Sequence, residues 1–363
     1  MTAESTPVPG GAPVPATEPA GAPAQPVRRD GEIPSRRIRS VPRAGWMVVA
    51  RKELADHLLS ARFVVLFIVV GLAALIPLYF AADAIRSAAS TVSGGQAIFI
   101  ALFWYAPKVG DAQIALPSVQ GFLGLVAPLL GLAFAFDSIN GERSQGTLPR
   151  LLSQPIHRDD VVNGKFAAGL AVIAIVIGVV IGVIAAFGIF RLGIVPTAAE
   201  ALRLILWLIL TFIYISFWLA FGMLLSVVVR RAATSALIGF GAWLLFTIFG
   251  GLITQLLGGF LAPLTGTVQQ QISNIQLQET INRFLPDTLY REASLTLLNP
   301  QVSSVSSPAT LAGYQQAQQR IPSLLSLDQS FILVWPQVVA LVALTVACFA
   351  IAYVRFMRQE VRA

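Results

Sequence analysis

Ionisable side chains are scarce in this chain, and two residue types that often build catalytic and metal sites are almost missing. Only 12% of the 363 residues are charged, whereas an average soluble domain has roughly 25%. The single cysteine, Cys348, predicts neither a disulfide framework nor a thiolate metal site. The two histidines, His57 and His157, form no HExxH run, and the sequence has no phosphate-binding GxxxxGK(S/T) loop. These absences argue against a metallohydrolase and against ATP binding by this chain.

Long apolar runs are abundant instead. Hydrophobic residues make up 56% of the chain, and its mean hydropathy is +0.74. A helix needs about 20 apolar residues to cross the roughly 30 Å hydrocarbon core of a bilayer. Six runs of about this length contain no Asp, Glu, Lys, Arg or His: residues 63–80, 116–136, 166–190, 204–229, 232–257 and 331–354. Lipid offers no partner to backbone N–H and C=O groups, so each run must be helical. The sequence predicts an all-α integral membrane protein with six transmembrane helices.

The distribution of basic residues predicts the orientation of these helices. If the N-terminus is cytoplasmic, 18 of the 25 Lys and Arg residues fall on the cytoplasmic side and 7 on the other side. This asymmetry is what the positive-inside rule expects, so we expect both termini in the cytoplasm and a multi-pass protein of the cytoplasmic membrane. Because the basic residues crowd the ends of the spans, anionic lipid accounts for them and no nucleic-acid partner is expected.

Residues 1–45 differ in composition from the rest of the chain. They are rich in Pro, Ala and Gly and then become basic, a composition that cannot bury enough surface to fold. We therefore expect a disordered cytoplasmic tail followed by one six-helix domain over residues 46–363. Within that domain, residues 137–165 form a cytoplasmic loop. Residues 258–330 form an extracytoplasmic segment, partly glutamine-rich, in which we expect short amphipathic helices.

Residues 46–60 carry an amphipathic pattern just before the first span. Apolar side chains recur every four residues, at Trp46, Ala50, Leu54 and Leu58. Charged side chains occupy the remaining arc, at Arg51, Lys52, Glu53 and Asp56. This spacing places the apolar side chains on one stripe of a helix. It predicts a helix lying in the inner membrane interface, with a helical extension of the first span into water as the alternative.

The loop of residues 137–165 has structural signals of its own. Gly141 and Gly146 are predicted to break the helix that descends from the second span, and Thr147 is placed to cap a new one. Pro155 disfavours helix at the residue before it and so ends that helix. Between these signals lies a short apolar stripe formed by Leu148, Leu151 and Leu152. An apolar stripe next to water indicates a covering partner, or else packing on this protein's own inner interface.

The same loop resembles the first cytoplasmic loop of permeases of the ABC-2 type. The matching residues are Glu142, Gly146, Thr147, Leu151, Leu152, Ser153, Pro155, Ile156, Arg158, Gly164 and Lys165. The helix of residues 46–60, with its run Arg51, Lys52, Glu53 and Leu54, resembles the interfacial helix that opens that family. Together with six spans and both termini inside, the resemblance covers residues 46–363.

The resemblance implies a function that the residues alone do not show. Residues 147–155 would be the coupling helix that docks on a separate ATPase subunit, with Leu148, Leu151 and Leu152 supplying the buried contact. Glu142 and Arg158 would orient that helix through charge-assisted hydrogen bonds. ATP and Mg²⁺ would be bound by the ATPase, so no cofactor is expected in this chain. A second permease chain would complete the transporter, as a homodimer or a heterodimer, and members of this family often export their substrates.

Two rival functions remain open at this stage. The spans contain no ionisable group of the kind that proton- or ion-coupled carriers place in the membrane, so uphill transport would need a cytoplasmic energy source. A passive channel or a membrane anchor would need none, although neither has a reason to present Leu151 and Leu152 beneath the membrane. An intramembrane hydrolase would need a buried nucleophile and base that the sequence does not indicate. The substrate is left open, and Thr211, Tyr214 and Ser216 are candidates to line its path.

Gly178 and Gly182 stand four residues apart in the third span. Small residues at this spacing let two helices approach closely. The pair predicts helix packing within the bundle or, alternatively, a seam between two copies of the chain.

Overall fold

The structure, a computed structural model of the chain, describes residues 45–91, 98–110, 114–147, 157–261, 267–299 and 326–359. The predicted disordered tail lies outside these ranges except for Gly45. The described helices are α1 (Gly45–Leu58), α2 (Ala61–Thr91), α3 (Ile98–Trp104), α4 (Val119–Ala135), α5 (Asn140–Ser144), α7 (Arg158–Leu192), α8 (Ala198–Val228), α9 (Ala232–Ile248), α10 (Gly250–Leu261), α11 (Val268–Asn282), α12 (Pro286–Leu298) and α14 (Leu327–Met357). Two short antiparallel strands, β1 (Lys108–Val109) and β2 (Ile114–Ala115), pair between α3 and α4.

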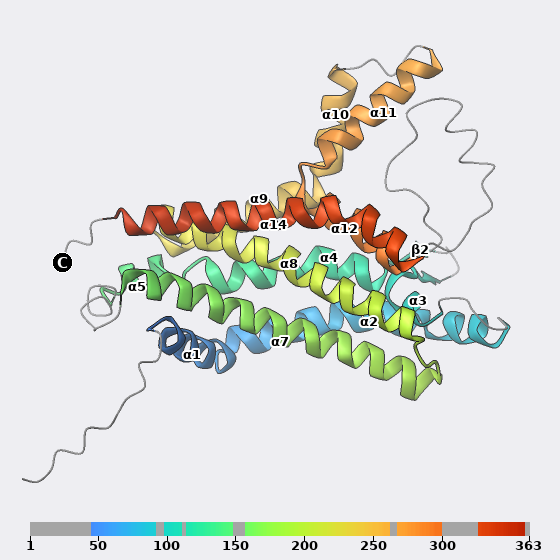
Figure 1. Cartoon of the computed structure of the whole chain (residues 1–363), viewed down its shortest axis with the longest axis horizontal. Coiled ribbons are helices and arrows are strands. Elements are labelled where there is room, and N and C mark those ends of the chain that lie inside the picture. Colours follow the sequence, from blue (N-terminus) through green and yellow to red (C-terminus); the bar gives the residue numbers. More distant parts are fainter. Residues whose placement is uncertain are drawn as a thin grey trace, which may run out of the picture. The chain divides into compact units, whose positions relative to one another are not determined.

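Five stretches of the described chain are long and apolar enough to cross a membrane. They are 61–87 in α2, 119–144 from α4 through α5, α7, α8 and α14, and the bent pair of α9 and α10 makes a sixth if it counts as one span. These helices lie side by side in one bundle (Figure 1). The prediction of a mostly helical membrane protein is therefore confirmed, with five or six spans in the part of the chain that the structure describes.

Helix α8 packs against most of the other long helices. It contacts α4, α7, α9, α12 and α14, and Trp207, Tyr214 and Trp218 on it are fully buried. Close packing depends on glycine where α4 crosses α8: a Cβ on Gly131 would lie 2.7 Å from the carbonyl oxygen of Ile215. Small residues let helix backbones approach to this distance in a membrane, where packing and not the hydrophobic effect drives association.

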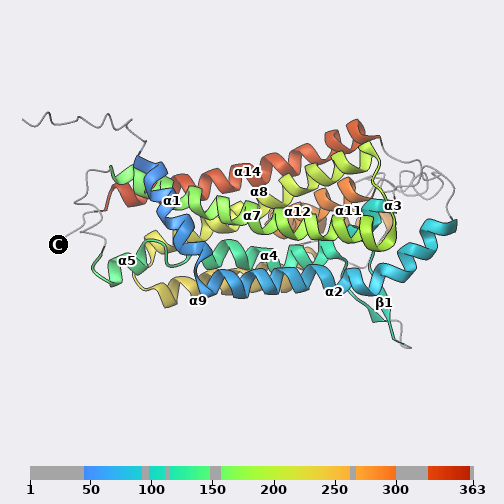
Figure 2. The same ribbon diagram turned by 90° about the horizontal axis from the view of Figure 1, so that it is seen from below.

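The two ends of the bundle differ in what they carry. Figures 1 and 2 place α1, α5 and the C-terminal end of α14 at one end, which we call the α5 end. They place α3 and the β1–β2 ribbon at the opposite end, which we call the α3 end. The two segments expected at the cytoplasmic face, residues 46–60 and the start of the loop 137–165, therefore share the α5 end.

The fifth predicted span, residues 232–257, is not one straight helix. Helix α9 ends at Ile248, and α10 starts at Gly250 with its axis bent by 61° from that of α9. Two consecutive glycines, Gly250 and Gly251, stand at the bend, and glycines are a common cause of sharp kinks. Hydropathy detects the apolar run but is insensitive to this change of direction.

The predicted extracytoplasmic segment of residues 258–330 contains helices, as expected, and one of them, α12, is part of the bundle. It packs against α8 and α14, and its Tyr290 ring stacks on Tyr214 with the ring centroids 4.3 Å apart. The Tyr290 hydroxyl lies 3.2 Å from the Thr211 hydroxyl, and the Tyr214 hydroxyl donates to the Gly124 carbonyl. In the single chain, Thr211 and Tyr214 therefore hold α12 and α4 in place, while Ser216 donates to the carbonyl of Phe212 in its own helix.

Gly178 and Gly182 do not pack against another helix of the described chain. A Cβ added to either would meet nothing within 4 Å. The interpretation that they serve packing within the bundle is therefore wrong, and the inter-chain alternative stays a prediction.

Candidate functional site

Helix α1 crosses the beginning of α7 at very short range. A Cβ on Gly164 would lie 2.6 Å from the Val49 Cβ and 2.8 Å from the Trp46 carbonyl oxygen. A Cβ on Gly45 would lie 2.3 Å from an Asp160 carboxylate oxygen. The two helices can approach this closely only because both positions lack a side chain.

The face that α1 presents to the protein is centred on residues outside the predicted apolar stripe. Its buried residue is Val49, and Glu53 faces the same side, whereas Trp46 is exposed. This buried face is thus centred one position away from the apolar stripe of Trp46, Ala50, Leu54 and Leu58, which was predicted to lie in the membrane interface. Leu54 also packs on the core. Counting apolar residues could not reveal this, because the buried face includes a carboxylate that is paired with a lysine of α7.

Asp160 ties the N-terminal ends of α1 and α7 together. Its carboxylate accepts hydrogen bonds from the backbone N–H of Trp46 at 2.9 Å and of His157 at 3.2 Å. A carboxylate is favourable at both places because helix N-termini carry partial positive charge and unpaired N–H groups. Helix α7 begins at Arg158, so Asp160 lies in its first turn.

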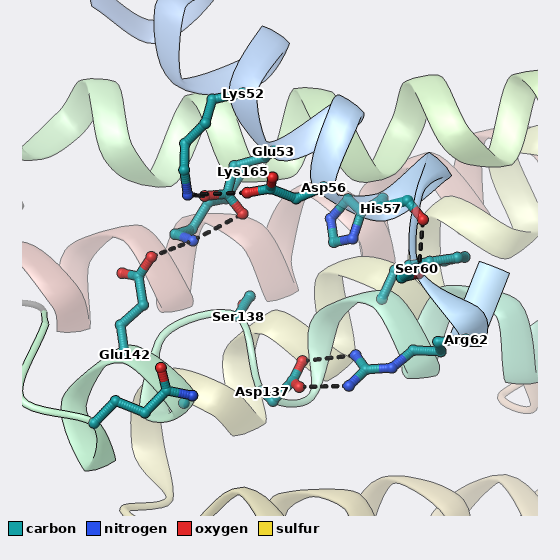
Figure 3. Close-up of a pocket in the computed structure, with 13 residues that line it drawn as sticks. Lys52, Glu53, Asp56, His57, Ser60, Arg62, Asp137, Ser138, Glu142 and Lys165 are labelled. Atoms are coloured by element: carbon teal, nitrogen blue, oxygen red, sulfur yellow. Dashed lines mark hydrogen bonds and ion pairs between the residues drawn. The ribbon is translucent and has the colours of Figure 1, made fainter.

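Lys165 is the centre of the site (Figure 3). Its ammonium group lies 3.0 Å from a Glu53 carboxylate oxygen on α1 and 2.8 Å from a Glu142 carboxylate oxygen on α5. The Lys165 side chain is only 4% exposed. Burial works to raise the pKa of the Glu53 carboxyl, but the charges and hydrogen bonds of Lys165 and Lys52 outweigh burial and lower that pKa overall. One buried cation therefore joins three elements through two carboxylates.

A second ion pair closes the same polar cavity. The Arg62 guanidinium donates to both Asp137 carboxylate oxygens, at 3.0 and 2.8 Å, and to the Ala133 carbonyl. This pair joins the start of α2 to the turn after α4. The cavity, of about 440 Å³, also borders Lys52, Asp56, Ser138 and Gln145. His57 lines it as well, and burial lowers the pKa of its imidazole, which favours the neutral ring.

Gln359, just after α14, is the centre of a second hydrogen-bond cluster at this end of the bundle. Its side-chain oxygen accepts from Arg143 of α5, and its backbone carbonyl accepts from Arg158 of α7 at 3.0 Å. Its side-chain nitrogen donates to the Val227 carbonyl of α8 at 3.0 Å. No pattern in the sequence pointed to Gln359, because a lone polar residue at a helix end is ordinarily solvated.

The described part of the predicted coupling loop ends in a defined turn. Gly146 has a φ of +68°, the left-handed conformation that glycine adopts readily, and Thr147 donates from its backbone N–H and its hydroxyl to the Glu142 carbonyl. Gly141 does not break the helix as predicted, since it lies inside α5. The Ser226 hydroxyl of α8 holds the first residues of α5 by accepting from the Ile139 N–H at 2.9 Å.

The remaining predicted contact residues, Leu148, Leu151, Leu152 and Pro155, lie outside the described residues. The predicted contact residues that the structure does describe lie on both sides of residues 148–156. Glu142 precedes them and bonds Lys165, while Arg158 follows them and bonds Gln359. Arg51 is exposed on α1 and Lys52 pairs with Glu53 and Asp56. Within the described ranges no group of three or more His, Cys, Asp or Glu residues could hold a metal ion.

The crossing of α1 and α7 yields a direct test. We expect Gly164→Val to destabilise the protein by about 1–3 kcal/mol, the usual effect of overpacking, because the new side chain would collide with Val49 and the Trp46 backbone. Gly241→Val on α9 is the matched control, since that position is open. Thermal unfolding of the purified protein in lipid nanodiscs measures the difference. Equal melting temperatures for the two variants would contradict the close crossing.

The fold and the site together define a multi-pass helical membrane protein with a structured ionic junction at one end of its bundle. The family follows from comparison: residues 47–361 match the family described as ABC-2 family transporter protein, and the chain belongs to it. The chain is also similar to the probable ABC transporter permease protein NosY of Stutzerimonas stutzeri. The two are 29% identical over 212 residues, which cover 56% of this chain and 67% of that relative. The protein is thus a membrane permease subunit.

Proposed function

We propose that this permease is driven by a separate ATPase that docks at the α5 end of the bundle. The observation that carries the proposal is Lys165, which joins the interfacial helix α1, the start of the loop and helix α7 through Glu53 and Glu142. Buried ions are costly unless they are paired and hydrogen-bonded. A junction of this kind would transmit a displacement of the loop by the ATPase to helices α1 and α7.

Both flanks of residues 148–156 are anchored. On the near flank α5 is held by Lys165 and by Gln359, and on the far flank Arg158 also bonds Gln359. A displacement of residues 148–156 by the ATPase would therefore move the ends of α7, α8 and α14 together with α1. Helices that are packed as rigid rods carry such a displacement across the membrane, as shear and hinge motions do in other proteins.

The individual residues take the following parts in this proposal. Leu148, Leu151 and Leu152 form the apolar contact with the ATPase, and ATP and Mg²⁺ are bound there and not in this chain. Glu142 and Arg158 flank the proposed coupling helix of residues 147–155. They hold its two ends to α7 and to Gln359.

The proposal also sets the topology and the assembly. The α5 end is cytoplasmic, because it carries most of the basic residues next to spans, so both termini face the cytoplasm of a cell whose cytoplasmic membrane holds the protein. A second permease chain, most simply an identical one, packs alongside. The open surface around Gly178 and Gly182 on α7 supports a close helix contact there. Substrate moves outward between the two chains.

Reconstitution tests the coupling. The chain is co-expressed with any P-loop ATPase that the neighbouring genes encode, and the pair is purified in nanodiscs. We expect a stable complex with two copies of each chain and ATP hydrolysis faster than that of the isolated ATPase. If no ATPase associates, or if the permease does not change the hydrolysis rate, a passive channel or a membrane anchor becomes the better assignment.

A further inference from the structure

The helical hairpin of α10 and α11, which we call the arm, projects from the side of the bundle (Figure 1). Helix α10 contacts α9 at its base and α11 along its length. The 61° bend at Phe249 turns the chain away from the direction of α9. The arm is therefore a separate surface feature, and the packing of the bundle does not explain its exposed side chains.

The buried positions of the arm are mainly small and polar groups, with the apolar side chain of Ile272 among them. Gly250, Thr254 and Gly258 form the buried stripe of α10. A Cβ on Gly258 would lie 2.3 Å from Gln278 of α11. The side-chain amide of Asn274, which is fully buried, donates to the Gly258 carbonyl at 2.9 Å.

The outer side of α10 is apolar, whereas a helix exposed to water normally has polar side chains on its outer side. Leu252, Leu256, Phe260 and Leu261 are exposed by 52%, 65%, 91% and 64%. A contiguous row of large apolar side chains on a soluble surface marks a contact with a partner or a membrane. Polar seams with apolar outer faces are the arrangement of helices packed inside lipid.

Two observations identify lipid as what covers this row. First, it continues the exposed apolar face of α9, where Leu244, Leu245, Ile248 and Phe249 are also exposed, and α9 is part of a candidate span. Secondly, α11 is mainly polar on its own outer side, where Gln270, Gln271, Ser273 and Thr280 are exposed together with the apolar side chain of Ile275. In Figure 1, α10 lies on the side of the arm nearer the α5 end, and α11 lies on the far side.

We propose that the arm lies along the bilayer surface at the α3 end of the bundle. The leucine face of α10 enters the hydrocarbon of that leaflet, and the polar face of α11 meets headgroups and water. The arm widens the footprint of the subunit in one leaflet only. Interfacial helices bind lipid in this way through one apolar face. In the arm, α10 supplies the apolar face and α11 supplies the polar face. The proposal does not depend on coupling to an ATPase.

Spin-label accessibility tests the proposal on the full chain in phosphatidylcholine nanodiscs. The native cysteine is removed by Cys348→Ala, and single labels are placed through Leu256→Cys on α10 and Gln271→Cys on α11. Leu237→Cys, at a position 74% exposed on α9, supplies the lipid reference. Phe260→Cys replaces Leu256→Cys if the latter does not fold.

We expect the label at 256 to collide with oxygen as often as the label at 237 does. We expect it to collide with a water-soluble nickel chelate at least about threefold less often than the label at 271, because a polar complex partitions poorly into hydrocarbon. Equal nickel accessibility at 256 and 271 would place the arm in water and overturn the proposal. A label at 256 shielded from both reagents would show that protein covers the leucine face, either a second copy or another partner, and would overturn it as well.

Discussion

Replacing Lys165 by methionine is expected to stop the permease from stimulating its ATPase and to destabilise the fold. Methionine keeps the length and burial of the side chain but leaves Glu53 and Glu142 facing each other without their shared cation. Removing one partner of a buried ion pair costs about 3–5 kcal/mol. We expect a lower melting temperature in nanodiscs. We also expect at least about a tenfold loss of stimulated ATP hydrolysis, which corresponds to a loss of about 1.4 kcal/mol of coupling free energy between the permease and the ATPase.

Two further variants separate the mechanical role of Lys165 from its role in stability. Lys52→Met removes a lysine from the same cavity whose side chain is 59% exposed, and surface pairs of this kind contribute little, so we expect behaviour close to that of the native protein. The triple variant Lys165→Met, Glu53→Gln and Glu142→Gln has no unpaired charge. It should recover stability while remaining uncoupled. Full recovery of stimulated hydrolysis in the triple variant would show that Lys165 only stabilises the fold.

Leu152→Asp is expected to abolish stimulated ATP hydrolysis while leaving membrane insertion and the melting temperature unchanged. The change places a charge in the apolar stripe proposed to enter the ATPase, where an unpaired buried charge is strongly unfavourable. Co-purification of the ATPase should be lost in parallel. Hydrolysis rates of the reconstituted pair, and the yield of folded permease in membranes, measure the two effects.

The control for this prediction is Leu59→Asp. Leu59 lies after α1 at the same end of the bundle and is 88% exposed. The substitution therefore introduces the same charge near the same membrane face without changing the apolar stripe of residues 148–152. We expect it to retain stimulated hydrolysis. If both variants retain hydrolysis, residues 147–155 are not the docking segment.

Several parts of the site could be predicted from the sequence because they rest on local rules. Gly146 was expected to interrupt the helix, and it adopts a left-handed conformation. The helix before the first span was found from its spacing of apolar residues, and it begins within one residue of the predicted position. Caps and breakers act through the backbone of their own neighbours, so a single segment contains the information that they need.

Other parts depended on contacts between distant segments. The one-position shift of the buried face of α1 follows from Gly164 and Lys165, more than 100 residues away in sequence. The role of Gln359 follows from three donors and acceptors on α5, α7 and α8. Periodicity shows which residues share a face, but it does not show which neighbour that face will meet.

The sequence by itself determined that this protein is helical and resides in a membrane, because crossing lipid requires an uninterrupted apolar run and such a run is visible residue by residue. It also predicted that ATP is bound by a separate chain, because the phosphate-binding loop is a contiguous motif that this sequence lacks. Only the tertiary structure decided that Lys165 joins α1 to α5 and that the fifth apolar run bends into an arm. An ion pair and a change of helix direction depend on what surrounds the residues in space, and hydropathy contains no term for either.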